Sequence, residues 1–344
     1  MPSYYAVTAK VRALYGRRIT PEDYRLLMAK QTVPEAAAFL QSHPGYRNRL
    51  SGLQTGSIHR EALENALRGA YMDEYRRIFS FMELRDKELL MFPVYRGEQD
   101  AILTSMRTLT STVVLEPVTT WEAVLRKSSQ LDLGALQEAK TFSDIAKAAE
   151  KTIYGSALRR IASGDSTNPP THAFVDNIMQ VVYFARLYKT VGKRYKGDTA
   201  KLLRQSLDEE TDLMNLVQFL RLKRYFSQED IQRYSFPLPC SSKLTKPYMQ
   251  ALMGAKDYEE ARDMVINGPY GKLFRSIDPK GLESYLYTLQ YNFSRRQLRA
   301  PKPTIYVPIA YLTLKEIEIR NLISIIECIR YKISPDTMVT LIGV

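Results

Sequence analysis

The 344-residue chain lacks the residues and motifs on which most catalytic and metal sites depend. Its three histidines, His43, His59 and His172, are far apart, and there is no H-E-x-x-H pair to hold zinc on one helix face. There is no G-x-G-x-x-G, and residues 268–273, the nearest stretch to a phosphate loop, lack its hydroxyl and its spacing. The sequence therefore predicts no catalytic residue, no cofactor and no metal.

Cysteine is almost absent as well. The two cysteines, Cys240 and Cys328, are widely separated and have no second pair beside them. A disulfide framework or a thiolate metal site requires a closer pattern than this. We interpret both residues as small thiols buried in the core of a protein that works in a reducing compartment.

Long apolar runs are also missing. No uncharged stretch approaches the length of about 18 apolar residues that spans a membrane. The most apolar segment, residues 305–312, is short and contains Pro308. Residues 1–18 show no apolar run followed by small residues, so we expect no secretory signal. We expect a protein that touches a membrane, at most, through its partners.

Positive charge is what the chain has in excess, with a formal net charge of +12 and a pI near 9.4. This charge fits nucleic acid, an anionic membrane surface or an acidic protein, and it fits equally a solvated excess of Lys and Arg on helix faces. The densest stretch is residues 189–197, whereas other basic pairs are scattered. The candidate partner-binding cations are Lys193, Arg194, Lys196, Lys223 and Arg224.

Helical periodicity dominates the sequence, and alternating strand patterns are scarce. Thr20-Pro21 places a capping hydroxyl before a proline at a first helical position. Apolar side chains recur every three or four positions in five long segments, residues 58–90, 172–195, 200–225, 281–298 and 309–331. The predicted fold class is all-α.

One stretch of sequence occurs twice. Asp212–Tyr225 aligns without a gap with Glu318–Tyr331, with four identical positions and five close replacements. A weaker copy, Glu98–Arg107, lies 114 residues before the first and carries Ala101 where the other two have asparagine. The pattern predicts that the same helix occurs three times along the chain.

A second motif repeats in the same order. Thr32, Thr141 and Asp257 each have an acidic residue three positions later, which is the pattern of a capping box at a helix start. A short helix and a tyrosine follow each of them. These tyrosines are Tyr46, Tyr154 and Tyr270, separated by 108 and 116 residues.

Together the motifs predict three similar helical-bundle repeats of about 110 residues, longer than common solenoid units. We place them at residues 1–118, 119–238 and 239–344, and expect them around an approximate threefold axis. The alternative is that no repeat exists, because any two helical bundles share capping boxes and apolar stripes. The structural repeat positions are Asp212, Asn215, Glu318, Asn321, Tyr154 and Tyr270.

The two asparagines of the repeat have two interpretations. Asn215 and Asn321 stand in apolar helix stripes, where an amide is unfavourable unless it is hydrogen-bonded. The structural interpretation is a tie to a neighbouring helix end, and the functional one is a polar contact with a partner.

Several of these stretches resemble the C subunit of bacterial and archaeal V-type (A-type) ATPases, which in eukaryotes corresponds to the d subunit. They are Tyr154–Leu158, Asp212–Lys223, and Ile309–Leu322 followed by Ser334–Asp336. The resemblance covers essentially the whole chain, and the C-terminal stretch is its most specific part. It is weaker in the first third, where Ala101 replaces the asparagine.

The resemblance implies a funnel of three helical domains with pseudo-threefold symmetry. It implies a non-catalytic central-stalk adaptor on the cytoplasmic face of the membrane, peripheral and part of a membrane-bound complex. The partners it implies are the central-shaft subunits D and F and the membrane proteolipid ring. In that position the protein would transmit torque and so couple ATP hydrolysis to proton or sodium transport, without an active site, a cofactor, a small-molecule substrate or bound nucleic acid.

A basic helical scaffold or nucleic-acid-binding protein is the alternative from another class. It would require a contiguous basic stripe with exposed aromatic residues between the cations. An enzyme of unknown type is third, and a deep pocket with convergent titratable groups would favour it.

Overall fold

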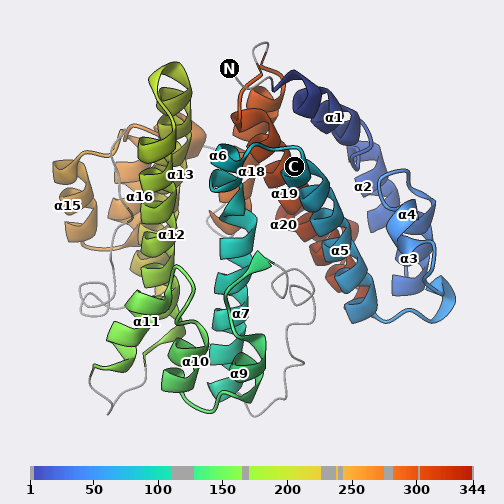
Figure 1. The fold of residues 1–344 in the computed structure, drawn as a ribbon, viewed down its shortest axis with the longest axis horizontal. Coiled ribbons are helices and arrows are strands. Elements are labelled where there is room, and N and C mark those ends of the chain that lie inside the picture. The colour runs from blue at the N-terminus through green and yellow to red at the C-terminus, as the bar shows by residue number, and fades with distance from the viewer. Residues whose placement is uncertain are drawn as a thin grey trace. The chain divides into compact units, whose positions relative to one another are not determined.

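The computed structural model describes residues 4–110, 128–164, 170–225, 238, 243–274, 282–300 and 303–342. Within these ranges every regular element is a helix, as Figure 1 shows. The prediction of an all-α fold is confirmed.

The chain divides into two compact units. The first joins Met1–Lys87 to Ile277–Val344, and the second is Glu88–Ser276. The first unit therefore combines segments from both ends of the sequence. The division into three repeats at residues 118 and 238 stays a prediction, as does the funnel with threefold symmetry.

The first unit has ten helical elements among its described residues. They are α1 (Tyr5–Tyr15), α2 (Pro21–Met28), α3 (Val33–Ser42), α4 (Arg47–Leu50), the 3₁₀ turn η1 (Thr55–Ser57), α5 (Arg60–Ser80), α6 (Leu84–Lys87), α18 (Leu282–Leu298), α19 (Tyr306–Arg330) and α20 (Pro335–Leu341).

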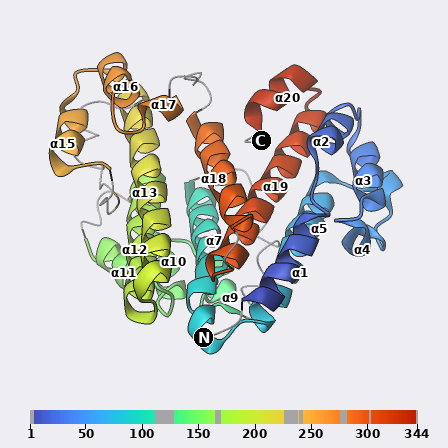
Figure 2. The ribbon, with the colours of Figure 1, turned by 90° about the horizontal axis from the view of Figure 1, so that it is seen from above.

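Helix α19 is the centre of the first unit. It packs against α18, α5 and α1, and also touches α2, α3 and α20, and Figure 2 shows it between its neighbours. The helix is apolar almost all round, which is typical of a buried helix. Leu322, Ile325 and Ile326 have no exposed surface. A helix from the end of the sequence is thus the core around which the N-terminal helices pack.

The second unit also has ten described helical elements. They are the 3₁₀ turn η2 (Leu89–Met91), α7 (Phe92–Thr110), α9 (Leu133–Glu138), α10 (Phe142–Ala148), α11 (Gly155–Ala162), α12 (His172–Arg194), α13 (Gly197–Tyr225), α15 (Lys246–Gly254), α16 (Tyr258–Ile266) and α17 (Gly271–Phe274).

The long helices α12 and α13 form a hairpin in the second unit. α12 packs between α7 and α13, and α13 packs in turn against α16. The turn passes through Gly197, whose φ of +61° is a left-handed conformation that glycine adopts without strain. The hairpin is visible in yellow-green in Figure 1.

The predicted capped starts of the short helices are confirmed. Thr32, Thr141 and Asp257 accept hydrogen bonds from the backbone amides three residues on, at the starts of α3, α10 and α16. At Thr141 the acid returns the bond to the capping residue itself. In the other two helices the acid instead accepts from the amide of the residue before the capping residue. Glu35 accepts from Gln31, and Glu260 accepts from Lys256.

Two of the repeated tyrosines are followed by glycines that the packing requires. A Cβ at Gly155 would collide with the backbone oxygen of Glu150, and one at Gly271 with that of Ile266. Both glycines are the first residues of short helices, α11 and α17, which follow closely after α10 and α16. Both obstacles are backbone atoms, which cannot rotate aside as the end of a flexible side chain could.

Gly155→Ala is therefore expected to lower the free energy of unfolding by about 2 kcal/mol, within the range typical of overpacking. Gly254→Ala is the matched control, because a Cβ there would meet nothing within 4 Å. Urea unfolding followed by circular dichroism measures both variants. Equal stability of the two variants would show that the close approach at Gly155 is unimportant.

Candidate functional site

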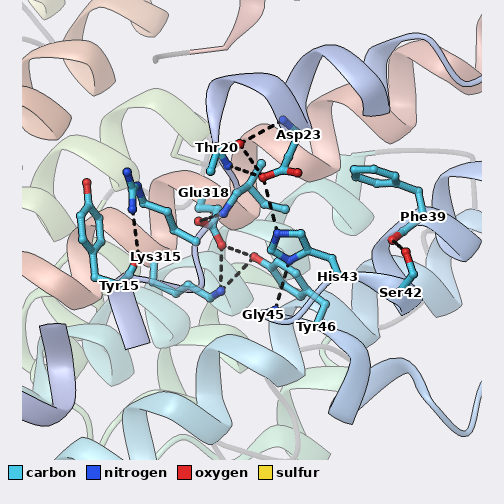
Figure 3. Close-up of polar contacts among 12 residues, drawn as sticks. Tyr15, Thr20, Asp23, Phe39, Ser42, His43, Gly45, Tyr46, Lys315 and Glu318 are labelled. Atoms are coloured by element: carbon cyan, nitrogen blue, oxygen red, sulfur yellow. Dashed lines mark hydrogen bonds and ion pairs between the residues drawn. The ribbon is translucent and has the colours of Figure 1, made fainter. Parts of the chain in front are cut away.

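Glu318 lies in the middle of α19 and is the centre of a buried polar cluster. Its Oε1 accepts hydrogen bonds from the hydroxyl of Tyr46 and from Lys315 Nζ, the latter at 2.8 Å. Its Oε2 accepts from the backbone amide of Ile19 at 3.0 Å. Figure 3 shows Glu318 and Lys315 of α19 meeting Tyr46 from the turn before α4, and Ile19 belongs to the segment between α1 and α2. One carboxylate thus holds three parts of the first unit.

The cluster extends to α5. Lys315 Nζ donates to the Tyr46 hydroxyl at 3.0 Å and lies 3.9 Å from a carboxylate oxygen of Glu74. Glu74 also accepts a hydrogen bond from the Tyr311 hydroxyl. Burial raises the pKa of Glu74, although Lys315 and the Tyr311 hydroxyl oppose the shift. The cluster therefore buries two carboxylates around one ammonium.

The tyrosines of this cluster remain donors at neutral pH. Burial and then the neighbouring carboxylates hold the pKa of Tyr46 and of Tyr311 well above the ordinary value. Loss of a hydroxyl proton would place another negative charge beside Glu318 or Glu74.

Asp212 has the corresponding place on α13. Its Oδ2 accepts from the Tyr270 hydroxyl at 2.9 Å and from the backbone amides of Lys243 and Leu244 at 3.0 and 3.4 Å. Its other oxygen is buried and has no partner among the described residues. Burial raises the pKa of Asp212, and the three hydrogen bonds oppose the shift. The carboxylate joins α13 to the segment before α15 and to the turn before α17.

Glu98 has this place on α7, but its contacts differ. The side chain is 3% exposed, and its Oε1 accepts from the Ser129 hydroxyl at 2.5 Å. The Tyr154 hydroxyl donates to the backbone oxygen of Tyr95, at 3.0 Å, instead of to the acid. Burial raises the pKa of Glu98 to about 7, against the effect of hydrogen bonds from Ser129 and the backbone of Gln130.

The three clusters follow one rule. Each long helix meets a tyrosine from the next capped motif along the chain, 56 residues after Glu98 and 58 after Asp212. No such motif follows Glu318, and its tyrosine is Tyr46, from the first motif of the chain. The sequence motifs indicated these positions, but the pairings between them were not predicted. The similar spacing of the first two pairs is the signal that could have shown them.

The asparagines of the repeat are buried next to backbone or tyrosine. Asn215 donates to the Leu238 oxygen at 3.1 Å and accepts from the Leu238 amide at 2.8 Å, so both ends of its amide hold one residue of a connecting segment. Asn321 is a hydrogen-bond neighbour of Tyr24, where its contact opposes the raising of the tyrosine pKa by burial. Partner contacts of either asparagine stay a prediction.

The five candidate cations fall at opposite ends of α13. Lys193, Arg194 and Lys196 lie at the α12–α13 turn, where both lysines are exposed and Arg194 Nε donates to Glu88 at 2.7 Å. At the other end, Lys223 is buried, and its ammonium donates to the backbone oxygen of Ala255. Burial lowers the pKa of Lys223. A direct partner contact through each of these cations stays a prediction.

The C-terminal ends of α13 and α19 carry the same pair of residues, an arginine followed by a tyrosine. Tyr225 is 66% exposed and Tyr331 61% exposed. The guanidinium carbon of the preceding arginine, Arg224 or Arg330, lies 5.4 Å from the ring centre in each case. We call these the Arg–Tyr pairs. They occupy equivalent positions of the repeat, and their exposure was not predicted from the sequence.

The described ranges contain no group of three or more His, Cys, Asp or Glu side chains placed to hold a metal ion. None of their helices is long and apolar enough to cross a membrane. His43 Nδ1 accepts from the Gly45 amide at 3.1 Å, inside a turn (Figure 3). Cys328 is a buried free thiol as predicted, whereas Cys240 lies outside the described residues.

Comparison with known proteins places these features in a family. The family described as ATP synthase (C/AC39) subunit matches residues 7–340. The C subunit of the A-type ATP synthase of Pyrococcus abyssi is 24% identical over 349 aligned residues, covering 99% of this chain and 90% of that protein. The same protein of Thermococcus kodakarensis is 22% identical with the same coverage. Ribonuclease 3 of Bordetella pertussis is 26% identical over 163 residues, 45% of this chain and 62% of that enzyme.

Glu318→Ala should leave the Lys315 ammonium and the Tyr46 hydroxyl buried without their carboxylate. We expect the free energy of unfolding to fall by about 3 kcal/mol, as when one partner of a buried pair is removed. Replacing both partners, Lys315→Met with Glu318→Ala, should be less destabilising than the sum of the single changes. Urea unfolding gives all three values, and Glu83→Ala, an exposed acid of the same unit, is the control. Additive effects would contradict the coupling.

Glu98 should make stability depend on pH. Its pKa rises from 4.5 to about 7 on folding, so the folded chain binds the proton more tightly and stability increases as pH falls from about 7 towards 4.5. Glu98→Gln removes this dependence, and should stabilise the chain at pH 8 by up to about 3 kcal/mol and have little effect near pH 4.5. Urea unfolding across this pH range tests it against Glu138→Gln, an exposed control. The same difference at every pH would contradict the assignment.

Proposed function

The chain belongs to the ATP synthase (C/AC39) subunit family, and we propose that it is the central-stalk adaptor of a rotary ATPase. Members of this family are structural subunits of a membrane-associated complex and not its catalytic part. In the proposed role the chain joins the central shaft, subunits D and F, to the proteolipid ring on the cytoplasmic face. There it transmits torque between ATP hydrolysis and proton or sodium transport. The family match over residues 7–340 carries this proposal.

The buried clusters supply the mechanical property that an adaptor needs. Close-packed protein interiors transmit strain because their side chains have little room to rearrange. Glu318 adds directional bonds to this packing, since it links α19 to Tyr46 and to the backbone of Ile19 within one unit. Force applied to α19 would therefore be carried directly to the N-terminal helices of the same unit.

The Arg–Tyr pairs are suitable as contact points for a partner protein. Tyrosine and arginine are the residues most often found at the energetic centres of protein interfaces, and large exposed rings are unfavourable in water. Tyr225 and Tyr331 present such rings at the C-terminal ends of the long helices α13 and α19. A contact made there would load the helix along its axis. We propose that these pairs bind the central shaft.

Purification of the tagged chain from detergent-solubilised membranes of its own cells tests both proposals. We expect the proteolipid ring and the shaft subunits to be recovered with the wild-type chain. With Arg224→Ala/Tyr225→Ala/Arg330→Ala/Tyr331→Ala we expect at least a tenfold loss of shaft subunits, because single interface residues of this kind each contribute about 2 kcal/mol.

Arg159→Ala/Arg160→Ala, at two exposed arginines of α11, is the control for a general loss of positive charge. Full recovery of the shaft subunits with the fourfold Arg–Tyr variant would show that the shaft binds another surface of the chain. The adaptor role would remain. Recovery of nucleic acid in place of a ring would overturn the adaptor role and favour the basic nucleic-acid-binding alternative.

A further inference from the structure

Five exposed cations gather where α12 ends and α13 begins. We call them the basic hairpin end, which consists of Lys189, Lys193, Lys196, Lys201 and Arg204. They come from the last two turns of α12, the turn itself and the first two turns of α13. Gly192 lies between the helices, because a Cβ built on it would be 3.1 Å from the guanidinium of Arg204. The two sets of cations therefore belong to one surface.

Few carboxylates balance this charge. Residues 186–204 contain seven Lys and Arg residues and a single acid, Asp198. Glu88 lies close by, but it is already shared by Arg186 at 3.3 Å and Arg194 at 2.7 Å. Among the described residues, none of the five cations of the basic hairpin end makes an ion pair within 4.0 Å. The surface keeps a concentrated positive charge that repels itself.

The kind of cation indicates the kind of partner. Four of the five are lysines, which are depleted at protein interfaces, whereas the tyrosine and arginine of interface centres occur at the other end of α13. Single-stranded nucleic acid needs exposed rings for its bases. Of the two aromatic residues in residues 186–204, Tyr195 is buried, and Tyr188 is half-buried with its hydroxyl bonded to Asp208 at 2.7 Å. Mobile ammonium groups without shape or stacking partners fit a fluid layer of anionic lipid headgroups.

We propose that the basic hairpin end binds the anionic headgroups of a phospholipid membrane. The contact is electrostatic, involves no insertion of apolar side chains, and weakens as salt is added. It goes beyond the adaptor role, because lipid and not another protein is the partner. The chain would then contact the membrane directly, independently of the proteolipid ring.

Binding of the full chain to vesicles tests the proposal. Vesicles of phosphatidylcholine with and without phosphatidylglycerol are sedimented with the chain at low and at high salt. We expect binding to the anionic vesicles alone, and only at low salt. Lys193→Gln/Lys196→Gln/Lys201→Gln should weaken it by about 100-fold, since each lysine near the surface contributes roughly a fivefold effect.

Lys140→Gln/Lys147→Gln/Lys151→Gln is the matched control, which removes three exposed lysines of the same unit around α10. It should retain affinity within about threefold of the wild type, because charges distant from the contact are screened. Circular dichroism and thermal unfolding of both variants establish that they are folded.

Three results would overturn the proposal. The first is an equal loss of vesicle binding in the two variants, and the second is no binding of the wild-type chain to anionic vesicles. The third is binding to a DNA duplex that is tighter than binding to the vesicles and that is lost when the same three lysines are replaced. The vesicles contain no other part of an ATPase, so failure here leaves the adaptor role standing. Conversely, loss of the ring in the purification experiment leaves vesicle binding unaffected.

Discussion

Buried carboxylates in the middle of long helices are the constraint on which the rest of the fold depends. A charge taken out of water is strongly unfavourable unless hydrogen-bond donors surround it, and those donors must sit at fixed distances. Glu318 and Asp212 obtain theirs from a tyrosine hydroxyl and from backbone amides. Apolar stripes alone are compatible with more than one packing arrangement, whereas each of these bonds requires particular atoms to lie at a fixed distance. The polar clusters therefore select one arrangement among many packings of similar hydrophobic helices.

This selection bears on the proposed role of the chain. Force carried by a helical bundle shifts its helices along or around one another, which is the motion that a buried carboxylate with directional partners resists. The same helix, α13, has an Arg–Tyr pair at one end and a lysine-rich surface at the other. Its two ends thus offer surfaces of different chemistry, one suited to a protein and one to lipid headgroups.

Local features of the structure could be predicted from the sequence, and long-range pairings could not. Thr141 caps its helix as expected, because a hydroxyl and an acid three residues apart act on neighbouring amides. The pairing of Tyr46 with Glu318 depends on how segments 272 residues apart meet, and no local pattern determines that. The sequence offered Lys223 as a candidate partner-binding cation, and it gave no sign that this side chain is buried and donates to the backbone oxygen of Ala255. Burial of a lysine depends on what packs beside it, here the loop before α16.

The first unit is interrupted in the sequence by the whole of the second, and this has a consequence for biosynthesis. Domains tend to fold as they leave the ribosome, in the order in which they are completed. Residues 88–276 are complete before α19 has been made, so the unit that starts later in the chain can finish first. Until then the N-terminal helices lack the core helix that covers them and the carboxylate that Tyr46 needs. A nascent chain cut short before α19 would keep that apolar surface open to chaperones and proteases, so synthesis of α19 decides when the first unit can close.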